Sequence, residues 1–213
     1  MTGSAHRDGA TLPASPAPAV TARGVARAAL FHYGRVLGNG TGVRRAVAAA
    51  LQAQPHERVL DVGCGTGGFC VAVPGDYVGI DPDPDYVAFA RWRWAAPRRT
   101  FYPVELATLP VDAPFDKAML VNCVHHMSDD AAAAILDRLA QLVRHRVVMA
   151  DLDPEPANRL QAFLIALDRG HFVRSRAAQR ALLTRHFRVV DEGQFRNTPH
   201  TAVHTLFVCE PKS

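Results

Sequence analysis

Short runs of apolar and β-branched residues alternate with helical patterns along most of the chain after Arg58. Each run spans four residues, which suits a short strand, and the runs lie at residues 59–62, 77–80, 101–104, 118–121 and 147–150. Before the last run, Ile135, Leu139 and Leu142 follow the spacing of one helix face. Strands separated by helices predict a parallel sheet with helices on both faces.

The segment after residue 150 contains two further strand-like runs, at 187–190 and 205–209. The stretch between Gly193 and His204 is too irregular for a crossover helix, so we expect an antiparallel hairpin at the sheet edge. The sequence therefore predicts a doubly wound, mostly parallel seven-stranded α/β sheet with an antiparallel last strand. One more helix is indicated by an apolar stripe at Leu160, Phe163, Leu164 and Leu167.

The first 54 residues differ in pattern from the rest. Residues 1–22 hold three prolines among Ala, Ser and Thr without apolar periodicity, which predicts a disordered tail. Residues 23–54 carry two short helical stripes with a Gly-Asn-Gly break between them, and we expect these helices to cap the main domain of residues 55–213. The stripes are Leu30, Tyr33 and Leu37, then Val43, Val47 and Leu51.

Composition narrows the class of protein. A chain of 213 residues with 48% hydrophobic residues suits one globular domain, and no run approaches the roughly 18 apolar residues of a membrane span. We expect a cytoplasmic protein whose four cysteines, which form no C-x-x-C pair, are reduced. The net charge of +4 is not gathered into a basic cluster, so neither a nucleic acid nor a membrane is an expected partner.

A glycine loop follows the first predicted strand, in the string Val-Leu-Asp-Val-Gly-Cys-Gly-Thr-Gly-Gly that begins at Val59. Its glycines fit two templates: G-x-G-x-x-G, which uses Gly68, and G-x-G-x-G, which uses Gly67. Asp61 would face a pyrophosphate unfavourably, which favours a cationic or zwitterionic ligand. Asp81, eighteen residues after Gly63, ends the second strand where it could accept both hydroxyls of a ribose.

From Arg58 onward the chain resembles the class I S-adenosylmethionine-dependent methyltransferases, because Val-Leu-Asp-Val-Gly-Cys-Gly-Thr-Gly matches the first motif of that family. Two further segments match family elements: Glu105 to Pro110 after the third strand, and Val-His-His-Met at residues 124–127. The resemblance implies S-adenosylmethionine as cofactor, S-adenosylhomocysteine as product and no metal. The cofactor-binding residues it implies are Asp61, Gly63, Cys64, Gly65, Gly67, Asp81, Pro82, Glu105, Leu106 and Asn122.

Candidates for a general base lie after the fourth and fifth strands. His125 or His126 could take a proton from the acceptor, although many family members carry such a pair for structural reasons. Asp151 and Asp153 are alternative bases at the carboxyl edge, and Asp153 followed by proline could equally start a helix.

Other polar residues have simpler interpretations. Asp83 and Ser128 each precede a helical pattern and are predicted N-caps. Trp92 and Trp94 should face different sides of their helix. A metal site at His200 and His204 is not expected, since no third ligand lies nearby in sequence.

We therefore expect a methyltransferase for a small-molecule acceptor, with an oxygen nucleophile first and nitrogen or carbon still open. Two alternatives are a nicotinamide-dependent reductase, weakened by the absence of a Tyr-x-x-x-Lys pair, and a silent member of the fold that binds cofactor without turnover. The acceptor pocket is expected to include residues of the cap and of the segment after the long helix. From chain order these are His32, Tyr33, His171 and Arg174, with Phe31, Arg35 and Arg169 nearby.

Overall fold

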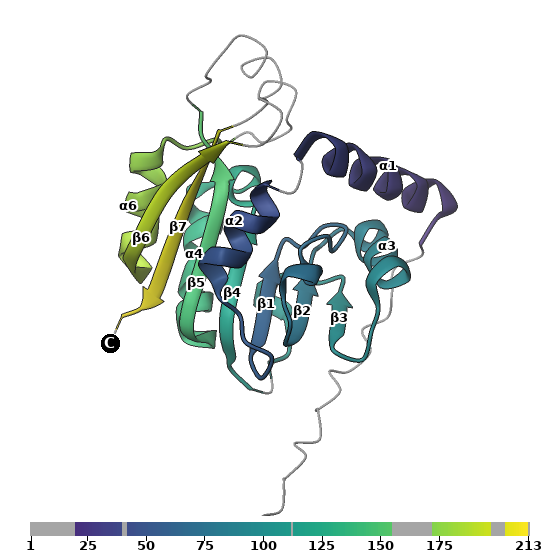
Figure 1. The fold of residues 1–213 in the computed structure, drawn as a ribbon, viewed down its shortest axis with the longest axis horizontal. Helices are drawn as coiled ribbons and strands as arrows, with labels where there is room; N and C mark the ends of the chain where they lie inside the picture. Colours follow the sequence, from purple (N-terminus) through teal and green to yellow (C-terminus); the bar gives the residue numbers. More distant parts are fainter. Residues whose placement is uncertain (1–19, 40–41, 112, 155–171, 197–202, 213) are drawn as a thin grey trace, which may run out of the picture.

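The computed structural model describes residues 20–39, 42–111, 113–154, 172–196 and 203–212. Its centre is a seven-stranded sheet in the order β3-β2-β1-β4-β5-β7-β6 (Figure 1). Neighbouring strands are parallel except beside β7, which runs antiparallel to both β5 and β6. The predicted fold class is thereby confirmed. The strands are β1 (Arg58–Val62), β2 (Asp76–Ile80), β3 (Arg99–Tyr102), β4 (Phe115–Val121), β5 (Val143–Leu152), β6 (Phe187–Arg196) and β7 (Val203–Pro211).

Helices cover both faces of the sheet. Buried side chains of α4 and α6 pack with Leu60 and Val62 on one face, whereas those of α2 and α3 pack with Val59 on the other. Successive strand residues point to opposite faces, so the alternation along β1 divides the core into these two layers. The helices are α1 (Ala22–Asn39), α2 (Gly42–Leu51), α3 (Pro84–Trp94), α4 (Asp129–Leu142) and α6 (Arg176–His186), with 3₁₀ turns η1 (Cys70–Ala72), η2 (Leu106–Thr108) and η3 (Val124–His126).

Strand positions agree with the sequence pattern to within a few residues: β4, β5, β6 and β7 are each longer than the predicted runs, and β3 begins and ends two residues before its run. The first cap helix begins at Ala22, one residue inside the segment predicted to be a tail. Residues 1–19 of that predicted tail and the stripe at 160–167 lie outside the described residues. The predicted division of the chain into tail, cap and main domain stays a prediction.

Helix α1 lies at the end of the sheet toward which β1, β2 and β3 point, beside α3 (Figure 1). Arg27 of α1 forms ion pairs with Asp83 at 2.8 Å and with Asp85 at 3.4 Å, at the start of α3. Phe31 stacks on Tyr86 with ring centroids 5.0 Å apart. The cap helix therefore docks over the carboxyl edge, where open α/β sheets bind their ligands.

Candidate active site

The glycine loop after β1 adopts the second of the two templates. Gly63, Gly65 and Gly67 have left-handed φ angles of +71°, +52° and +74°, and Gly68 is not among the residues with positive φ. The amides of Gly63 and Cys64 both donate to the Ile80 carbonyl at 2.9 Å, which fixes the loop to the end of β2. Left-handed angles favour glycine, so the backbone itself selects G-x-G-x-G.

The three loop glycines have different surroundings. A Cβ at Gly63 would lie 2.7 Å from Cβ of Cys123, and one at Gly67 would lie 2.7 Å from the ring of Phe101. A Cβ at Gly65 would meet no atom within 4 Å. Packing thus explains the glycines at 63 and 67, whereas Gly65 borders open space into which a ligand can approach the backbone.

Asp81 links this loop to the start of α3. Its Oδ2 accepts from the Gly65 amide at 2.8 Å, and its Oδ1 accepts from the Asp83 amide at 2.9 Å. Burial raises the pKa of the Asp81 carboxyl, and these two hydrogen bonds offset only part of the rise. Each carboxylate oxygen keeps a second lone pair, so the group that shapes the loop can also accept ribose hydroxyls.

Asp61 has a partner that sequence reasoning missed. Its carboxylate is only 1% exposed, and it accepts a hydrogen bond of 2.5 Å from the Tyr77 hydroxyl. Burial, together with the nearby Asp61 charge, raises the pKa of Tyr77 well above its usual value, so the phenol stays protonated and donates. The sequence predicts that Asp61 contacts the cofactor. In the structure its carboxylate is bonded to Tyr77 inside the protein.

The remaining expected cofactor residues differ in exposure. Cys64 is buried, and burial followed by the Asp61 charge raises the pKa of its thiol, so its backbone is what it offers a ligand. Pro82 and Glu105 are exposed, and Glu105 precedes η2 without a side-chain capping bond. Leu106 is 2% exposed and its side chain belongs to the core, so the contact with an adenine that the resemblance implies could come only from its main chain.

Asn122 follows β4 in an unusual conformation. It has φ +53°, a left-handed angle for a residue that carries a Cβ, while its amide donates to the Ala150 carbonyl at 2.9 Å. Its side-chain Oδ1 is buried and has no hydrogen-bond partner among the residues that the structure describes. Strained backbone and orphaned polar atoms gather at ligand sites, so Asn122 offers an acceptor to a donor from outside the chain.

The buried pair of His125 and Asp151 anchors the turn η3 to the end of β5. The Nδ1 atom of His125 contacts Oδ1 of Asp151, and the His125 amide donates to Oδ2 at 3.0 Å. Both side chains are at most 4% exposed. The structure thus places Asp151 as a partner that orients His125, rather than as a carboxylate open to an acceptor.

His126 lies on the same turn but is exposed, with its ring centroid 4.1 Å from that of His125. The other carboxylate candidate, Asp153, is 2% exposed and accepts from Nε2 of Gln194 at 2.5 Å. Of the four candidate bases, His126 is therefore the one that an acceptor can reach from solvent.

The residues predicted to line the acceptor pocket have different surroundings in the structure. Tyr33 is 52% exposed on α1, and His171 lies outside the described part of the chain. Arg174 is occupied by the protein: it donates to the carbonyls of Val124 at 2.9 Å and Met127 at 2.7 Å and pairs with Asp129. Arg174 therefore stabilises η3, the turn that carries His126, whereas a substrate contact was expected of it.

His32 contacts the glycine loop rather than an acceptor. Its Nδ1 lies 3.0 Å from Oγ1 of Thr66, and its side chain is buried. The indole of Trp94 donates to the Thr66 carbonyl at 3.0 Å, so α1 and α3 hold the loop together. Sequence reasoning missed both contacts, since it predicted for Trp94 only that it faces a different side of its helix from Trp92.

Two local predictions are confirmed. Asp83 caps α3 by accepting from the amides of Asp85 at 2.9 Å and Tyr86 at 3.3 Å, and Ser128 caps α4 by accepting from Ala131 at 3.3 Å. Within the described ranges no cluster of three metal-ligating side chains occurs. No helix in those ranges has the length and apolarity to cross a bilayer.

A sheet of this order, with a glycine loop after its first strand and an acid after its second, defines the class I S-adenosylmethionine-dependent methyltransferases. Residues 59–146 match the family model described as a methyltransferase domain, and the fold of the described residues is that of this class. The chemistry of the site fits the cofactor, because Gly65 borders open space, Asp81 has acceptor capacity left and Asn122 has an unpaired acceptor.

Individual relatives agree with this class. The O-methyltransferase cnsE of Penicillium expansum is 34% identical over 124 residues, which is 53% of this chain, and the match spans 44% of that relative's length. The solved structure of TnmH is 28% identical with a TM-score of 0.67, covering 89% of this chain and 58% of that one. Magnesium protoporphyrin IX methyltransferase from Synechocystis PCC 6803, solved with bound S-adenosylhomocysteine, shares the fold at 19% identity with a TM-score of 0.62, covering 80% and 82% of the two chains.

Proposed function

We propose that this protein transfers the methyl group of S-adenosylmethionine to a hydroxyl oxygen of a small molecule. The observation that carries the proposal is the exposed imidazole of His126 on a turn that the His125–Asp151 pair and Arg174 hold rigidly at the carboxyl end of β4. The Penicillium expansum relative is named as an O-methyltransferase, which supports the same acceptor chemistry.

The cofactor, when bound, supplies a methyl group already activated on a sulfonium. The Gly65 amide and Asp81 would hold its sugar side, and Asn122 would accept from one of its donors. The chain's own task is then to hold an acceptor oxygen in line and to exclude water.

His126 would take the proton that the hydroxyl loses as its oxygen forms the new carbon–oxygen bond. A general base must lie within hydrogen-bond reach of the proton it removes, and exposure gives His126 that access. The His125–Asp151 pair acts as a positioning element, because it fixes the turn on which His126 is carried.

The acceptor should carry apolar as well as hydroxyl groups. Tyr33 on α1 and Phe172, which precedes α6, are 52% and 43% exposed, and Leu30 on α1 is 77% exposed. The Phe172 amide donates to the carbonyl of His125 at 3.0 Å. Phe172 therefore lies beside the residue that precedes His126, the candidate base. Exposed aromatic residues at a ligand-binding edge favour an aromatic acceptor such as a phenol.

The test is to incubate the protein with deuteromethyl-labelled S-adenosylmethionine and a panel of phenols, amines, thiols and carboxylic acids. We expect the label on the oxygen of one or more phenols, detected by mass spectrometry and located by NMR. Label found only on amines or thiols, or on none of the panel while S-adenosylhomocysteine still binds, would contradict the acceptor class.

The base is tested with His126→Ala and His125→Ala once an acceptor is known. His126→Ala should lower kcat by about 10²–10⁴ with unchanged affinity for S-adenosylhomocysteine, and free imidazole should restore part of the rate. A larger, imidazole-rescued loss in His125→Ala would transfer the role to His125. Asp151→Asn is the positioning control and should show no rescue, since it removes a support rather than the base.

A further inference from the structure

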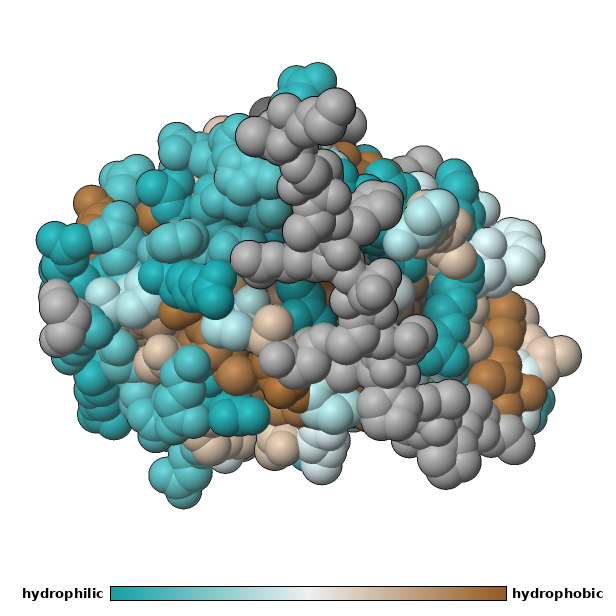
Figure 2. All heavy atoms as spheres, turned by 90° about the horizontal axis from the view of Figure 1, so that it is seen from below, coloured by the Kyte–Doolittle hydropathy of each residue, from teal (hydrophilic) through white to brown (hydrophobic). Residues whose placement is uncertain are grey.

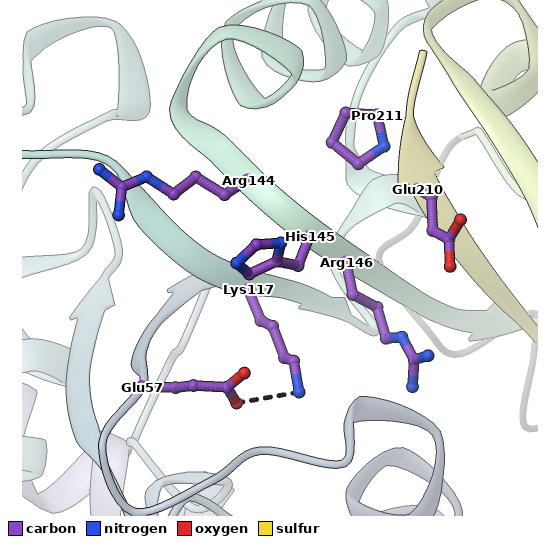
Figure 3. Close-up of a pocket in the computed structure, with 7 residues that line it drawn as sticks. All are labelled: Glu57, Lys117, Arg144, His145, Arg146, Glu210 and Pro211. Carbon is purple, nitrogen blue, oxygen red and sulfur yellow. Dashed lines mark ion pairs between the residues drawn. The ribbon is translucent and has the colours of Figure 1, made fainter. Parts of the chain in front are cut away.

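A polar pocket of about 480 Å³ opens at the edge of the sheet opposite the glycine loop. Its lining residues come from the segment before β1, the start of β4, the start of β5 and the end of β7, and they are Glu57, Lys117, Arg144, His145, Arg146, Glu210 and Pro211 (Figure 3). The surface seen from this end of the molecule is mostly hydrophilic (Figure 2). The volume lies within the roughly 300–1,000 Å³ usual for small-molecule sites.

The floor of the pocket is a neutral ion pair. Lys117 lies 2.9 Å from Oε2 of Glu57, and both side chains are about one-tenth exposed. Burial alone would raise the pKa of Glu57, but the hydrogen bonds from Lys117 and from the Gln54 amide overcome that effect and lower it. Lys117 also donates to the Gln52 carbonyl at 2.7 Å, so its ammonium group is bonded to acceptors of the protein itself.

The wall on β5 has an excess of positive charge. Arg146 is the direct partner of Lys117 in the register of β4 and β5, so two cations lie side by side on adjacent strands. Arg146 donates to the Ala50 carbonyl at 2.9 Å and to Oε1 of Gln52 at 3.0 Å, both of which are uncharged acceptors. Arg144 is exposed and forms no ion pair within the described part of the chain.

The acids of the pocket do not compensate these guanidinium groups. Glu57 is paired with Lys117, and Glu210 is paired with Arg188 at 2.5 Å. His145, which also lines the pocket, lies 4.0 Å from Asp116. Arg144 and Arg146 therefore leave the pocket with positive charge that its acids do not balance, and an anion would balance it.

We propose that this pocket binds a small polyanion that carries at least two phosphate or carboxylate groups, one for each of the guanidinium groups of Arg144 and Arg146, which extend to opposite sides of His145 (Figure 3). Planar guanidinium groups match both kinds of anion with paired hydrogen bonds. The site is separate from the methyl-transfer edge, because Arg146 and Asp151 are five residues apart on β5, or roughly 17 Å. The inference does not depend on the identity of the methyl acceptor.

Isothermal titration of the whole protein tests the proposal, with inorganic pyrophosphate as the phosphate probe and citrate as the carboxylate probe. We expect one equivalent of at least one probe to bind, with weaker affinity at higher salt and no change when S-adenosylhomocysteine saturates the other edge. Binding of only one probe would identify which of the two anions the site prefers. Displacement by S-adenosylhomocysteine, or no binding of either probe, would overturn the proposal.

Arg144→Gln is the diagnostic variant, since Arg144 makes no described structural contact and its loss should leave folding intact. We expect the affinity for the bound probe to fall by about ten-fold, as for the loss of a charge-assisted hydrogen bond. Arg138→Gln on α4 is the matched control, because it removes the same charge from a partly exposed arginine that bonds only Gln141 among the described residues. Equal losses in the two variants would show diffuse electrostatic attraction and contradict a defined site.

Discussion

At the scale of single residues, the loop after β1 shows that identical amino acids can serve opposite purposes. Gly63 and Gly67 leave room for the side chains of Cys123 and Phe101. Gly65 borders open space, which leaves room for a ligand. All three have left-handed φ angles, so a substitution at any of them is strained. Only the surroundings separate a glycine needed for folding from one needed for binding.

This difference gives a matched pair of variants. Gly65→Val should reduce the affinity for S-adenosylhomocysteine by at least about ten-fold while costing the fold only about 1–2 kcal/mol for its left-handed angle. Gly67→Val should lower the free energy of unfolding by clearly more, since its side chain meets Phe101 at 2.7 Å. Calorimetric titration and urea unfolding check both, and normal binding by a folded Gly65→Val would show that the open space is not the cofactor's.

The raised pKa of the Asp81 carboxyl predicts that cofactor binding depends on pH. Its pKa is raised by burial, so acidification protonates it at a higher pH than an ordinary aspartate, and the protonated acid is a poorer acceptor for ribose hydroxyls. Affinity for S-adenosylhomocysteine should therefore fall as pH drops through that raised pKa. In Asp81→Asn the affinity should be lower throughout and the acid-dependent fall should vanish, as measured by titration at several pH values.

The same shift affects stability with the opposite sign. A carboxyl whose pKa is raised on folding binds its proton more tightly in the folded state. Its contribution to the free energy of unfolding is thus largest below the unfolded pKa of about 3.9 and is lost as pH rises through the folded value. Cofactor binding and unliganded stability should therefore respond to Asp81 in opposite directions over that window.

At the scale of elements, α1 is attached to the cofactor edge through both segments that shape it. His32 contacts Thr66 of the glycine loop, and Arg27 pairs with Asp83, whose amide is bound by Asp81. Anything that orders the loop and Asp81 should therefore order α1 as well. The cap helix and the cofactor site behave as one coupled unit.

Arg27→Gln tests this coupling. Exposed ion pairs contribute about 0.2–1 kcal/mol each, so amide exchange in residues 22–33 should quicken by about three-fold and the affinity for S-adenosylhomocysteine should fall modestly. Arg23→Gln, which removes an equal charge from the same helix, should leave both unchanged. Hydrogen exchange mass spectrometry with and without ligand makes the comparison, and equal effects of the two variants would argue against coupling through Asp83.

Most helices and strands could be predicted from the sequence, because the patterns that specify them lie within short stretches of the chain. Buried strands such as β1 and β4 require mostly apolar runs, and the N-caps of α3 and α4 require short polar residues at one position. The outer half of β6, at residues 191–196, was not predicted because its polar residues pair through backbone hydrogen bonds, which leave no apolar pattern. The candidate site was predicted only where a motif is continuous in sequence.

Contacts between distant segments account for what was missed. Tyr77 reaches Asp61, Trp94 reaches Thr66, and Arg174 reaches the carbonyls of η3 from fifty residues away. Such pairings depend on how elements pack, and no periodicity along the chain encodes them. That is also why His126 and His125, adjacent and identical in sequence, could be separated into exposed and buried only in three dimensions.

At the scale of the whole molecule, the sheet is completed by strands from the end of the described chain. β7 lies between β5 and β6, and its Phe207 is fully buried in the layer that α4 and α6 cover. The pocket wall at the start of β5 and the His125–Asp151 pair at its end both stand on the strand that β7 supports. Loss of β7 packing should thus affect both ends of the sheet.

Phe207→Ala should lower the free energy of unfolding by about 3–5 kcal/mol, because it removes a buried aromatic side chain and leaves a cavity. Val190→Ala, at a position 42% exposed on β6, should change it by no more than about 0.5 kcal/mol. Urea denaturation followed by circular dichroism measures both. A change below about 1 kcal/mol for Phe207→Ala would mean that β7 is not an integral part of the core.

The position of β7 also bears on how the chain is made. A ribosome synthesises β5 and β6 before β7, yet those two strands have no hydrogen bonds to each other in the finished sheet and meet only through β7. During translation each therefore presents an unpaired edge, the feature that recruits foreign strands and aggregates. Protection of the nascent chain by a chaperone should matter most in the interval between the synthesis of β6 and the release of β7 from the exit tunnel.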